Sequence, residues 1–173
     1  MDLLSLAFLA VFPILMVVTG LSDLTTMRIP NWISLALLAA FFPAALLAGL
    51  NPVEIAVHLG VGVAALVVGM GLFALNWIGG GDAKALAAAC LWLGFGDLAP
   101  LLLGIGVAGG GFCLLLLIAR QSYPLLSPAP PRVTWVARLL EPQGDIPYGV
   151  AIAIGALLAF PEADLMSRFL TAG

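Results

Sequence analysis

The sequence predicts an all-α integral membrane protein with six transmembrane helices and both termini on the outer side of the membrane. Of its 173 residues 63% are hydrophobic and only 9% are charged, with a mean hydropathy of +1.19. A soluble domain carries about 25% charged residues. Apolar runs of membrane-spanning length recur along the chain, and basic residues gather in alternate connections between these runs.

The apolar runs occupy most of residues 1–173, which we interpret as a single membrane domain. Proline, glycine or short polar stretches separate them, as expected between helices. Six Lys and Arg residues are too few for a surface that follows nucleic acid phosphates. The approximate expected spans are residues 3–20, 32–49, 53–76, 83–96, 98–119 and 146–160.

The first three spans follow from apolar length and from the breaks between them. Residues 3–20 are apolar throughout, and a short polar connection leads to Pro30, which suits the break before the second span. A turn at Asn51 and Pro52 precedes a third, glycine-rich span that carries His58 near its start. We expect His58 to contact a helix end or lipid headgroups, because a metal or catalytic pair would need further histidines.

The fourth segment is the shortest, below the roughly 17 residues needed to cross a membrane unless it begins within it near Asp82. The distribution of charge decides between crossing and turning back. If the segment crosses, five basic residues lie on one side of the membrane. The other side then carries acidic residues and one basic residue, Arg168. Because basic loops stay in the cytoplasm, we expect crossing. The five are Arg28, Lys84, Arg120, Arg132 and Arg138.

The last third of the chain contains two further spans separated by the one sizeable loop. The fifth span carries three consecutive glycines at residues 109–111, which permit close helix contact. Four prolines between Pro124 and Pro131 argue against helix there, and residues 133–140 suit a short amphipathic turn. The sixth span is followed by a mixed-charge tail. Both cysteines, Cys90 and Cys113, lie in apolar runs and are expected to be free thiols.

The chemistry centres on the stretch Gly79-Gly80-Gly81-Asp82-Ala83-Lys84. An acid at membrane depth costs about 2.5–3.5 kcal/mol and marks a functional site by default. Three consecutive glycines disfavour helix, so we expect the backbone to open just before Asp82. Open backbone at this depth must be buried in protein or line a wet cavity.

A second acid, Asp23, follows the first span and lies on the same side of the membrane in the predicted topology. Two carboxylates in one low-dielectric cleft cannot both ionise readily, so they share a proton. The ionised partner can activate water while the protonated partner polarises a peptide carbonyl. This chemistry requires no metal and no cofactor. Taken alone, each acid also fits a structural role. Asp23 could be a loop residue or a helix cap, and Asp82 could be an ion-pair partner of Lys84.

The residues around both acids resemble the motifs of the type IV prepilin peptidases, which are GxGD-type intramembrane aspartic proteases. The two motifs are Asp23-Leu-Thr-Thr-Met-Arg-Ile-Pro-Asn31 and Gly79-Gly-Gly-Asp82-Ala-Lys84, and Pro147-Tyr148-Gly149-Val150-Ala151 resembles the start of the family's last helix. The resemblance covers nearly the whole chain in helix number and motif order. It implies a GxGD aspartyl protease architecture with Asp23 and Asp82 as the catalytic pair.

The same resemblance implies removal of a short basic leader from type IV prepilins or pseudopilins at the cytoplasmic face of the bacterial inner membrane. Larger family members carry a cytoplasmic insertion with paired Cys-x-x-Cys motifs after the first helix and also N-methylate the product. Here that connection is residues 21–31 and has no cysteine. The compact form therefore resembles the peptidases of Flp/Tad pili, with methyltransferase activity not expected. The expected partners are prepilins, the lipid bilayer and pilus-assembly proteins, but not nucleic acid.

Supporting roles fall on neighbours of the two acids and on the start of the sixth span. Gly79 and Gly81 would let the backbone approach the substrate or allow helix packing. Lys84 would lower the pKa of Asp82, hold the loop, or extend to the membrane–water interface. Asn31 would cap a helix or form hydrogen bonds near the acids. Pro147 and Gly149 would form a broken, mobile start of the last helix.

Two other classes of function stay open at this point. Intramembrane acids and broken helices also occur in ion- or proton-coupled transporters, although no inverted repeat is visible here. A non-catalytic pilus-assembly subunit that binds pilin helices would retain the same residues. Loss of processing on Asp82→Asn would distinguish an enzyme from such a subunit.

Overall fold

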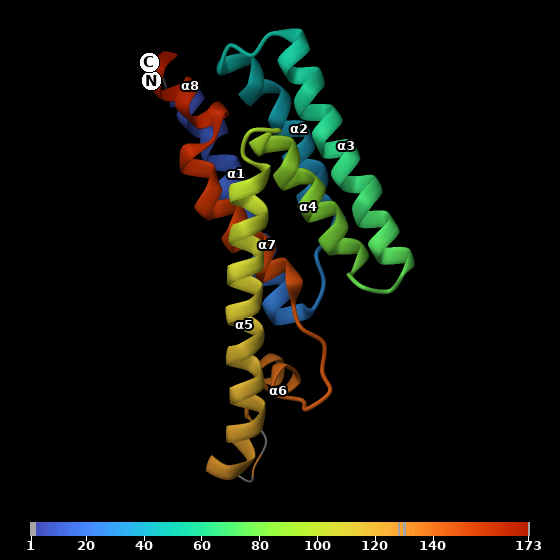
Figure 1. Cartoon of the computed structure of the whole chain (residues 1–173). Helices are drawn as coiled ribbons and strands as arrows, with labels where there is room; N and C mark the ends of the chain where they lie inside the picture. Colours follow the sequence, from blue (N-terminus) through green and yellow to red (C-terminus); the bar gives the residue numbers. More distant parts are fainter. Residues whose placement is uncertain (1–2, 128, 130, 173) are drawn as a thin grey trace.

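The computed structural model describes residues 3–127, 129 and 131–172, which form helices and connecting turns without a strand in that described part (Figure 1). The α-helices are α1 (Leu3–Thr26), α2 (Asn31–Leu47), α3 (Pro52–Ala74), α4 (Gly80–Leu93), α5 (Leu98–Leu126), α6 (Thr134–Leu139), α7 (Tyr148–Ala159) and α8 (Asp164–Ala172). A short 3-10 helix, Phe160–Glu162, joins α7 to α8.

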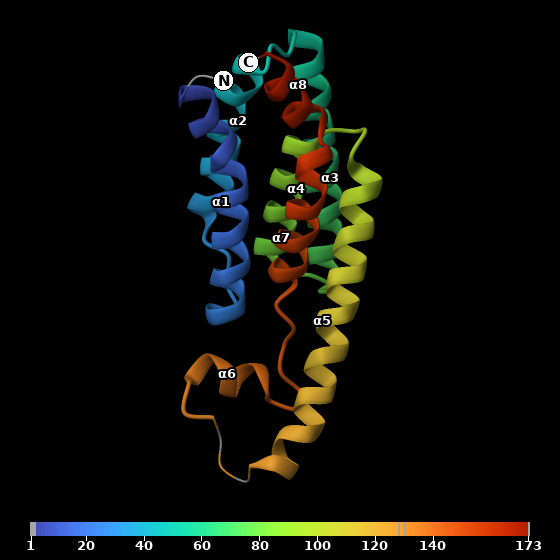
Figure 2. The same ribbon diagram turned by 90° about the vertical axis from the view of Figure 1, so that its left-hand side faces the viewer.

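The long helices run alternately up and down along one bundle axis (Figure 1). Helix α4 packs against α2, α3 and α7, while α7 also packs against α1 and α5. The start of α1 and the end of α8 lie at the same end of the bundle (Figure 2). At the opposite end, α5 extends beyond the other helices and carries α6 beside it. An even number of passes therefore brings both ends of the described chain to one side.

The helices support a membrane protein, although only some of them are long enough to span by themselves. Three apolar helices pass a length and hydropathy test: Ala7–Thr26, Pro52–Ala74 and Leu98–Leu125. A fourth is added if Tyr148–Glu162 and Asp164–Leu170, bent by 43°, count as one. Helix α2 is a shorter apolar helix of 17 residues, and α4 has only 14. The membrane class is thus confirmed, whereas the count of six spans stays a prediction.

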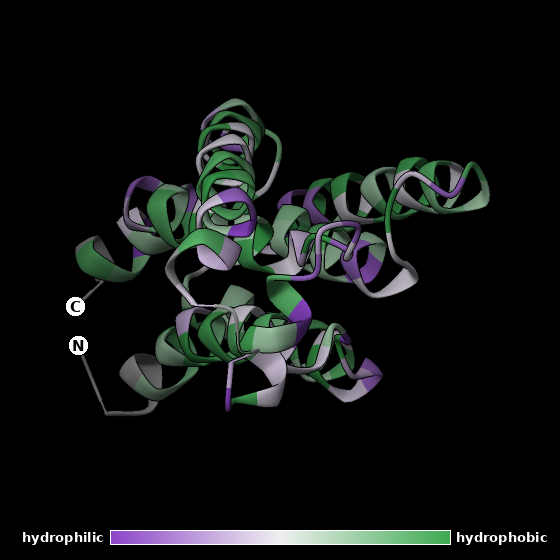
Figure 3. Cartoon of the chain, turned by 90° about the horizontal axis from the view of Figure 1, so that it is seen from below, coloured by the Kyte–Doolittle hydropathy of each residue, from purple (hydrophilic) through white to green (hydrophobic). Residues whose placement is uncertain are grey.

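Apolar side chains cover the outside of the bundle as well as its interior. Only 11% of the α5 span and 22% of the α3 span is buried. Their exposed residues include Val63 and Val67 on α3 and Leu103 and Leu115 on α5. Seen from below, apolar residues occupy all sides of the helices (Figure 3). Such large exposed apolar faces are expected where lipid replaces water.

An aromatic cluster joins four elements in the half of the bundle away from the two acids. Trp92 of α4 is fully buried, and its indole N–H donates to the Leu37 carbonyl of α2 at 2.9 Å. Its ring stacks on Phe12 of α1 at 5.2 Å and meets Phe41 edge-on at 6.0 Å. Phe12 also contacts Phe160 at 4.6 Å. The cluster holds α1, α2, α4 and the end of α7 in one packing unit.

Close helix contact depends on small residues, as expected, but at different glycines. A Cβ placed on Gly155 of α7 would lie 2.5 Å from the Ile105 backbone nitrogen, so only glycine fits between α7 and α5. At the predicted positions of α5, a Cβ on Gly109 would contact Ala151 at 3.2 Å. One on Gly110 or Gly111 would meet no described atom within 4 Å. The close approach is therefore centred on Gly155.

Three helix boundaries differ from the prediction. Helix α1 continues past residue 20, where the Thr25 and Thr26 hydroxyls donate to carbonyls of the preceding turn, and it ends at Met27, which has a positive φ of 54°. Helix α4 includes Gly80 and Gly81, so the backbone opens before Gly79 rather than directly before Asp82. Helix α5 runs to Leu126 and contains Pro124, where the prolines predicted no helix.

His58 differs most from its predicted role at a helix end or headgroup. Its side chain is only 6% exposed, and Nδ1 lies 2.7 Å from the Leu91 carbonyl of α4. Its ring also packs on Phe41 with centroids 5.4 Å apart. Gly94 has a φ of 76°, and a Cβ there would lie 2.7 Å from the imidazole. His58 is a buried packing residue between α2, α3 and the end of α4.

The predicted free thiols are confirmed, and the stretch predicted as a short amphipathic turn contains the six-residue helix α6. Helix α6 covers residues 134–139 within the predicted amphipathic stretch. Cys90 is buried and Cys113 half-buried, and both are free. The mixed-charge tail forms the additional helix α8, where Arg168 pairs with Glu54 of α3 at 2.7 Å and with Asp164 at 2.9 Å. These pairs connect α8 to the first turn of α3.

Candidate active site

Asp23 lies on the last turns of α1 and is 6% exposed. One carboxylate oxygen accepts a hydrogen bond of 2.7 Å from the backbone N–H of Gly149, at the start of α7. The first N–H groups of a helix have no partner within the helix and carry a partial positive charge. The start of α7 therefore favours the ionised form of the Asp23 carboxylate, although Asp23 and Gly149 are 126 residues apart in the sequence.

Asp82 lies in the first turn of α4 and is half-buried. Its carboxylate accepts a hydrogen bond of 3.0 Å from the backbone N–H of Gly79, which fixes the start of the helix. The carboxylate is close enough to Asp23 to interact with it electrostatically, and it also interacts with the Gly149 amide. The two predicted acids thus lie close enough to interact, and the 2.7 Å hydrogen bond from the Gly149 N–H goes to Asp23.

Ile29, in the connection between α1 and α2, packs under both acids. A Cβ on Gly81 would lie 3.0 Å from the Ile29 Cβ. A Cβ on Gly149 would lie 2.7 Å from the Ile29 Cδ1 and 2.8 Å from an Asp23 carboxylate oxygen. Glycine at both positions lets α4, α7 and this connection meet at the acids. Ile29 was not singled out from sequence, because nothing in its type marks it.

We expect Gly149→Ala to reduce peptidase activity by about 10²-fold, the scale associated with a misplacement of about 1 Å. The added methyl group would overlap Asp23 and Ile29 and push the carboxylate away from Asp82. Thermal unfolding in detergent and the initial rate of leader removal measure the two effects. Gly110→Ala is the matched control, since its methyl group meets no described atom within 4 Å. Equal rates for both variants would contradict this role of Gly149.

Lys84 does not pair with Asp82, although it follows two positions later. Its ammonium group donates to the Asn31 side-chain oxygen at 2.8 Å, at the first turn of α2. Asn31 makes no side-chain cap in this part of the structure, and Pro30 occupies the cap position of α2. The pair therefore links the start of α4 to the start of α2. This corrects the expectation that Asn31 caps a helix.

The remaining predicted residues lie at helix starts beside the acids. Gly79 occupies the N-cap position of α4 and Pro147 that of α7, both with extended backbone. Pro147 is buried, whereas Gly79 is exposed. Gly149 is buried at the second residue of α7. The broken start of the last helix is present, while its mobility stays a prediction.

A polar cavity of about 740 Å³ lies at the end of α1 that carries Asp23, although neither acid lines it. One wall is the end of α1, from Thr25 to Arg28, one turn past Asp23. The other wall is formed by Arg138 and by the loop that ends at Asp145, four residues before Gly149. The cavity is therefore a polar space beside the candidate site, one turn from Asp23.

Arg120 of α5 holds the second wall of this cavity in place, a role that the sequence analysis did not foresee. The guanidinium is buried and donates to the Leu139 carbonyl at 2.8 Å and to the Asp145 carbonyl at 3.0 Å. Charged donors on carbonyls are among the stronger hydrogen bonds in proteins. The only sequence signal was a single basic residue at the end of a long apolar run.

No group of three or more His, Cys, Asp or Glu side chains is arranged for a metal ion in the described residues. The described residues bring two carboxylates and a backbone N–H to the site. Such a pair can act as general acid and general base in one step.

Comparison with known proteins identifies the family of this arrangement. A model of the type IV leader peptidase family matches residues 10–115, more than half of the chain, which include Asp23 and Asp82. No match was found among curated proteins or among solved structures. The family match and the adjacent acids agree with the resemblance of the two motifs, and the chain belongs to the type IV leader peptidase family.

Proposed function

We propose that the protein is an aspartic endopeptidase that removes the leader peptide from Flp-like type IV prepilins, with Asp23 and Asp82 as its catalytic pair. The observation that carries the proposal is that Asp82 lies within electrostatic reach of Asp23, whose carboxylate accepts a 2.7 Å hydrogen bond from the Gly149 N–H. A leader peptidase must hydrolyse a peptide bond, and two interacting carboxylates beside a polar cavity suit that reaction.

In the proposed reaction one ionised carboxylate takes a proton from water while its protonated neighbour donates to the carbonyl oxygen of the scissile bond. The water oxygen attacks the carbonyl carbon, the C–N bond breaks and the departing nitrogen takes up a proton. The Gly149 N–H, 2.7 Å from Asp23, stabilises the ionised form of that carboxylate. Asp23 therefore suits the base, and Asp82 suits the acid.

We further propose that α1, α2, α3, α4, α5 and α7 cross the bacterial inner membrane, with the acids at the cytoplasmic face. Arg28 and Arg138 line the cavity at this end of the bundle, and Arg120 holds its wall. Concentration of basic residues on one side supports cytoplasmic placement. The helices α2 and α4 are short, so the bilayer would thin locally or their ends would lie below its surface.

The connection between α1 and α2 supports a compact peptidase without methyltransferase activity. Residues 27–30 alone join the two helices, and they contain no cysteine. This short segment carries Ile29 into the site and has no length for a folded insertion.

Incubation of the purified protein with a candidate Flp-type prepilin, followed by mass spectrometry, tests the proposal. We expect a single cut between the leader and the apolar helix, with an unmethylated N-terminus on the product. Intact substrate across several prepilins, together with proton-coupled uptake in liposomes, would instead favour a transporter. Intact substrate without uptake would favour an assembly subunit.

A further inference from the structure

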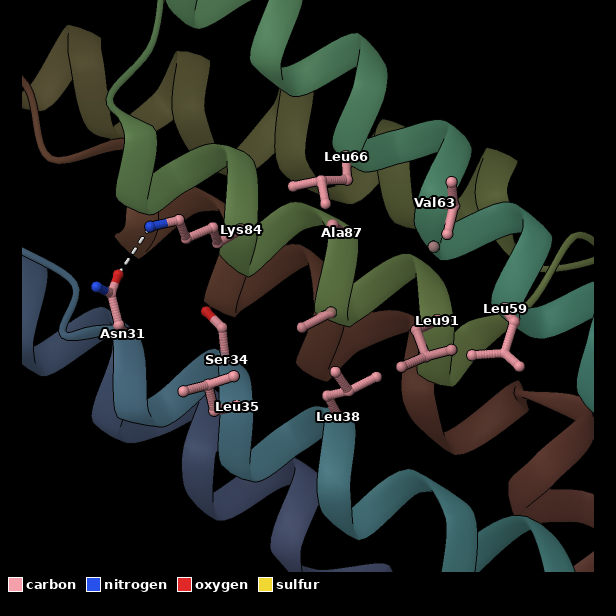
Figure 4. A pocket seen from close by; sticks show the side chains of 12 residues that line it. Asn31, Ser34, Leu35, Leu38, Leu59, Val63, Leu66, Lys84, Ala87 and Leu91 are labelled. Atoms are coloured by element: carbon pink, nitrogen blue, oxygen red, sulfur yellow. Dashed lines mark hydrogen bonds between the residues drawn. The ribbon is translucent and has the colours of Figure 1, made fainter.

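An apolar groove of about 440 Å³ runs between α2, α3 and α4. Leu35 and Leu38 of α2, Val63 and Leu66 of α3, and Ala87 and Leu91 of α4 are among the residues that line it. Figure 4 shows these side chains facing the space between the three helices. We refer to it as the α2–α3–α4 groove.

One end of the groove is polar and carries a single charge. Lys84, Asn31 and Ser34 lie there, with the Lys84 ammonium bonded to the Asn31 oxygen at 2.8 Å (Figure 4). An ammonium group has three donors, and this bond uses one. The groove lining contains no carboxylate, and Lys84 has no ion pair among the described residues. The mouth of the groove therefore presents an available cation above an apolar channel.

The size of the groove favours a single acyl chain over a transmembrane helix. A helix with its side chains is about 10–12 Å across. The groove offers about 440 Å³, and α4 packs directly against both α2 and α3, so no helix-wide gap separates the three. A flexible hydrocarbon chain fits such a space, whereas a helix could at most lie over its mouth.

Along the groove, a charged end is followed by apolar surface, as in a membrane lipid. A phospholipid places its phosphate at the membrane face and its acyl chain toward the middle. Lys84 lies at the end of the bundle that holds the two acids, and Leu59 and Leu91 line the groove toward the opposite end. Basic residues at the mouth of clefts between helices favour anionic headgroups.

We propose that the α2–α3–α4 groove binds one acyl chain of an anionic phospholipid whose phosphate accepts hydrogen bonds from Lys84. The phosphate uses the two ammonium donors left by Asn31, and the acyl chain covers Ala87 and Leu91. A zwitterionic phosphatidylcholine offers the same chain with a compensated headgroup and binds more weakly. The site lies on the face of α4 that turns away from Asp23 and α7.

The bound lipid also steadies the site of hydrolysis, a consequence that rests on the proposed function. Lys84 is two residues from Asp82, and Asn31 is two residues from Ile29, which packs under Gly81 and Gly149. A phosphate held at Lys84 and Asn31 fixes the starts of α4 and α2 relative to each other. Leader removal should therefore be faster in anionic than in zwitterionic lipid.

Binding is tested on the purified full chain by native mass spectrometry with phosphatidylglycerol and phosphatidylcholine of identical acyl chains. We expect about tenfold tighter binding of phosphatidylglycerol, as one charge-assisted contact implies. Lys84→Gln should remove this preference, and Lys84→Arg should restore it. Ala87→Leu, which fills the groove, should weaken binding of both lipids. Arg132→Gln, an exposed cation that lines neither the groove nor the polar cavity, is the matched control and should leave the binding of both lipids unchanged.

Equal binding of the two lipids by the wild type, or an unchanged preference in Lys84→Gln, would overturn the proposal. If Lys84→Gln does not fold, unaltered phosphatidylglycerol binding by Ala87→Leu overturns it independently. A raised KM for prepilin in Ala87→Leu with unchanged lipid binding would assign the groove to substrate instead. These binding measurements need no peptidase activity, so they stand even if the proposed hydrolysis fails.

Discussion

Asp82→Asn is expected to reduce leader removal by about 10³-fold or more while the bundle stays folded, because acid–base catalysis contributes roughly 10²–10⁴-fold. An asparagine oxygen can still accept the 3.0 Å hydrogen bond from the Gly79 N–H, so the start of α4 is retained. An amide cannot donate a carboxyl proton to the scissile carbonyl, so the shared-proton chemistry is lost. Initial rates of prepilin cleavage by mass spectrometry measure the effect.

Asp23→Asn should have a similar effect, and the double variant should be no slower than either single one. Residues that act as a unit lose nearly everything with the first substitution. Asp97→Asn is the matched control, because this half-buried acid lies at the other end of α4 and only accepts a 3.3 Å bond from the Asp164 N–H. Cleavage by either catalytic variant at the wild-type rate would contradict the two-aspartate mechanism.

The pairing of the two acids was the part of the site that sequence could predict. Asp23 and Asp82 each lie at a junction marked by glycine or proline, and the topology placed both junctions on one side. Their meeting followed from that placement and from the motif resemblance. The structure adds the partner that holds them, since the Gly149 amide donates to Asp23.

The residues that were missed act through backbone or packing, which leave little trace in sequence. Gly149 was predicted as part of a broken, mobile helix start, and its N–H donor and the space that it leaves for the Asp23 carboxylate were not foreseen. Ile29 resembles any other apolar residue in this chain. Arg120 donates to two backbone carbonyls. Every residue has a backbone carbonyl, so the sequence does not mark these partners.

Helix boundaries were missed for a related physical reason. The composition marks apolar stretches, but the end of α1 is held against α7 through Asp23 and Gly149 and stays helical past the apolar run, with the Thr25 and Thr26 hydroxyls bonded to carbonyls one turn earlier. Gly80 and Gly81 disfavour helix on propensity alone, yet the packing of α4 against α3 and Ile29 keeps them helical. Tertiary contacts decided both cases.

Trp92→Ala is expected to destabilise the fold by about 3 kcal/mol, the lower end of the range for large aromatic residues in cores. Removal of the indole leaves a cavity between Phe12, Phe41 and Phe160 and breaks the 2.9 Å hydrogen bond to the Leu37 carbonyl. The lower end applies because separated helices face lipid as apolar as the core, so lost packing rather than transfer from water dominates.

Trp77→Ala separates this packing effect from the loss of a tryptophan as such. Trp77 follows α3, and 69% of its surface is exposed, so its removal opens no cavity. Thermal unfolding in detergent should show a midpoint lower by about 6–12 °C for Trp92→Ala and nearly unchanged for Trp77→Ala. Trp92 lies ten residues along α4 from Asp82, about 15 Å away, so cleavage below the midpoint should persist. Equal midpoints for the two variants would mean that the aromatic cluster does not hold α1, α2 and α4 together.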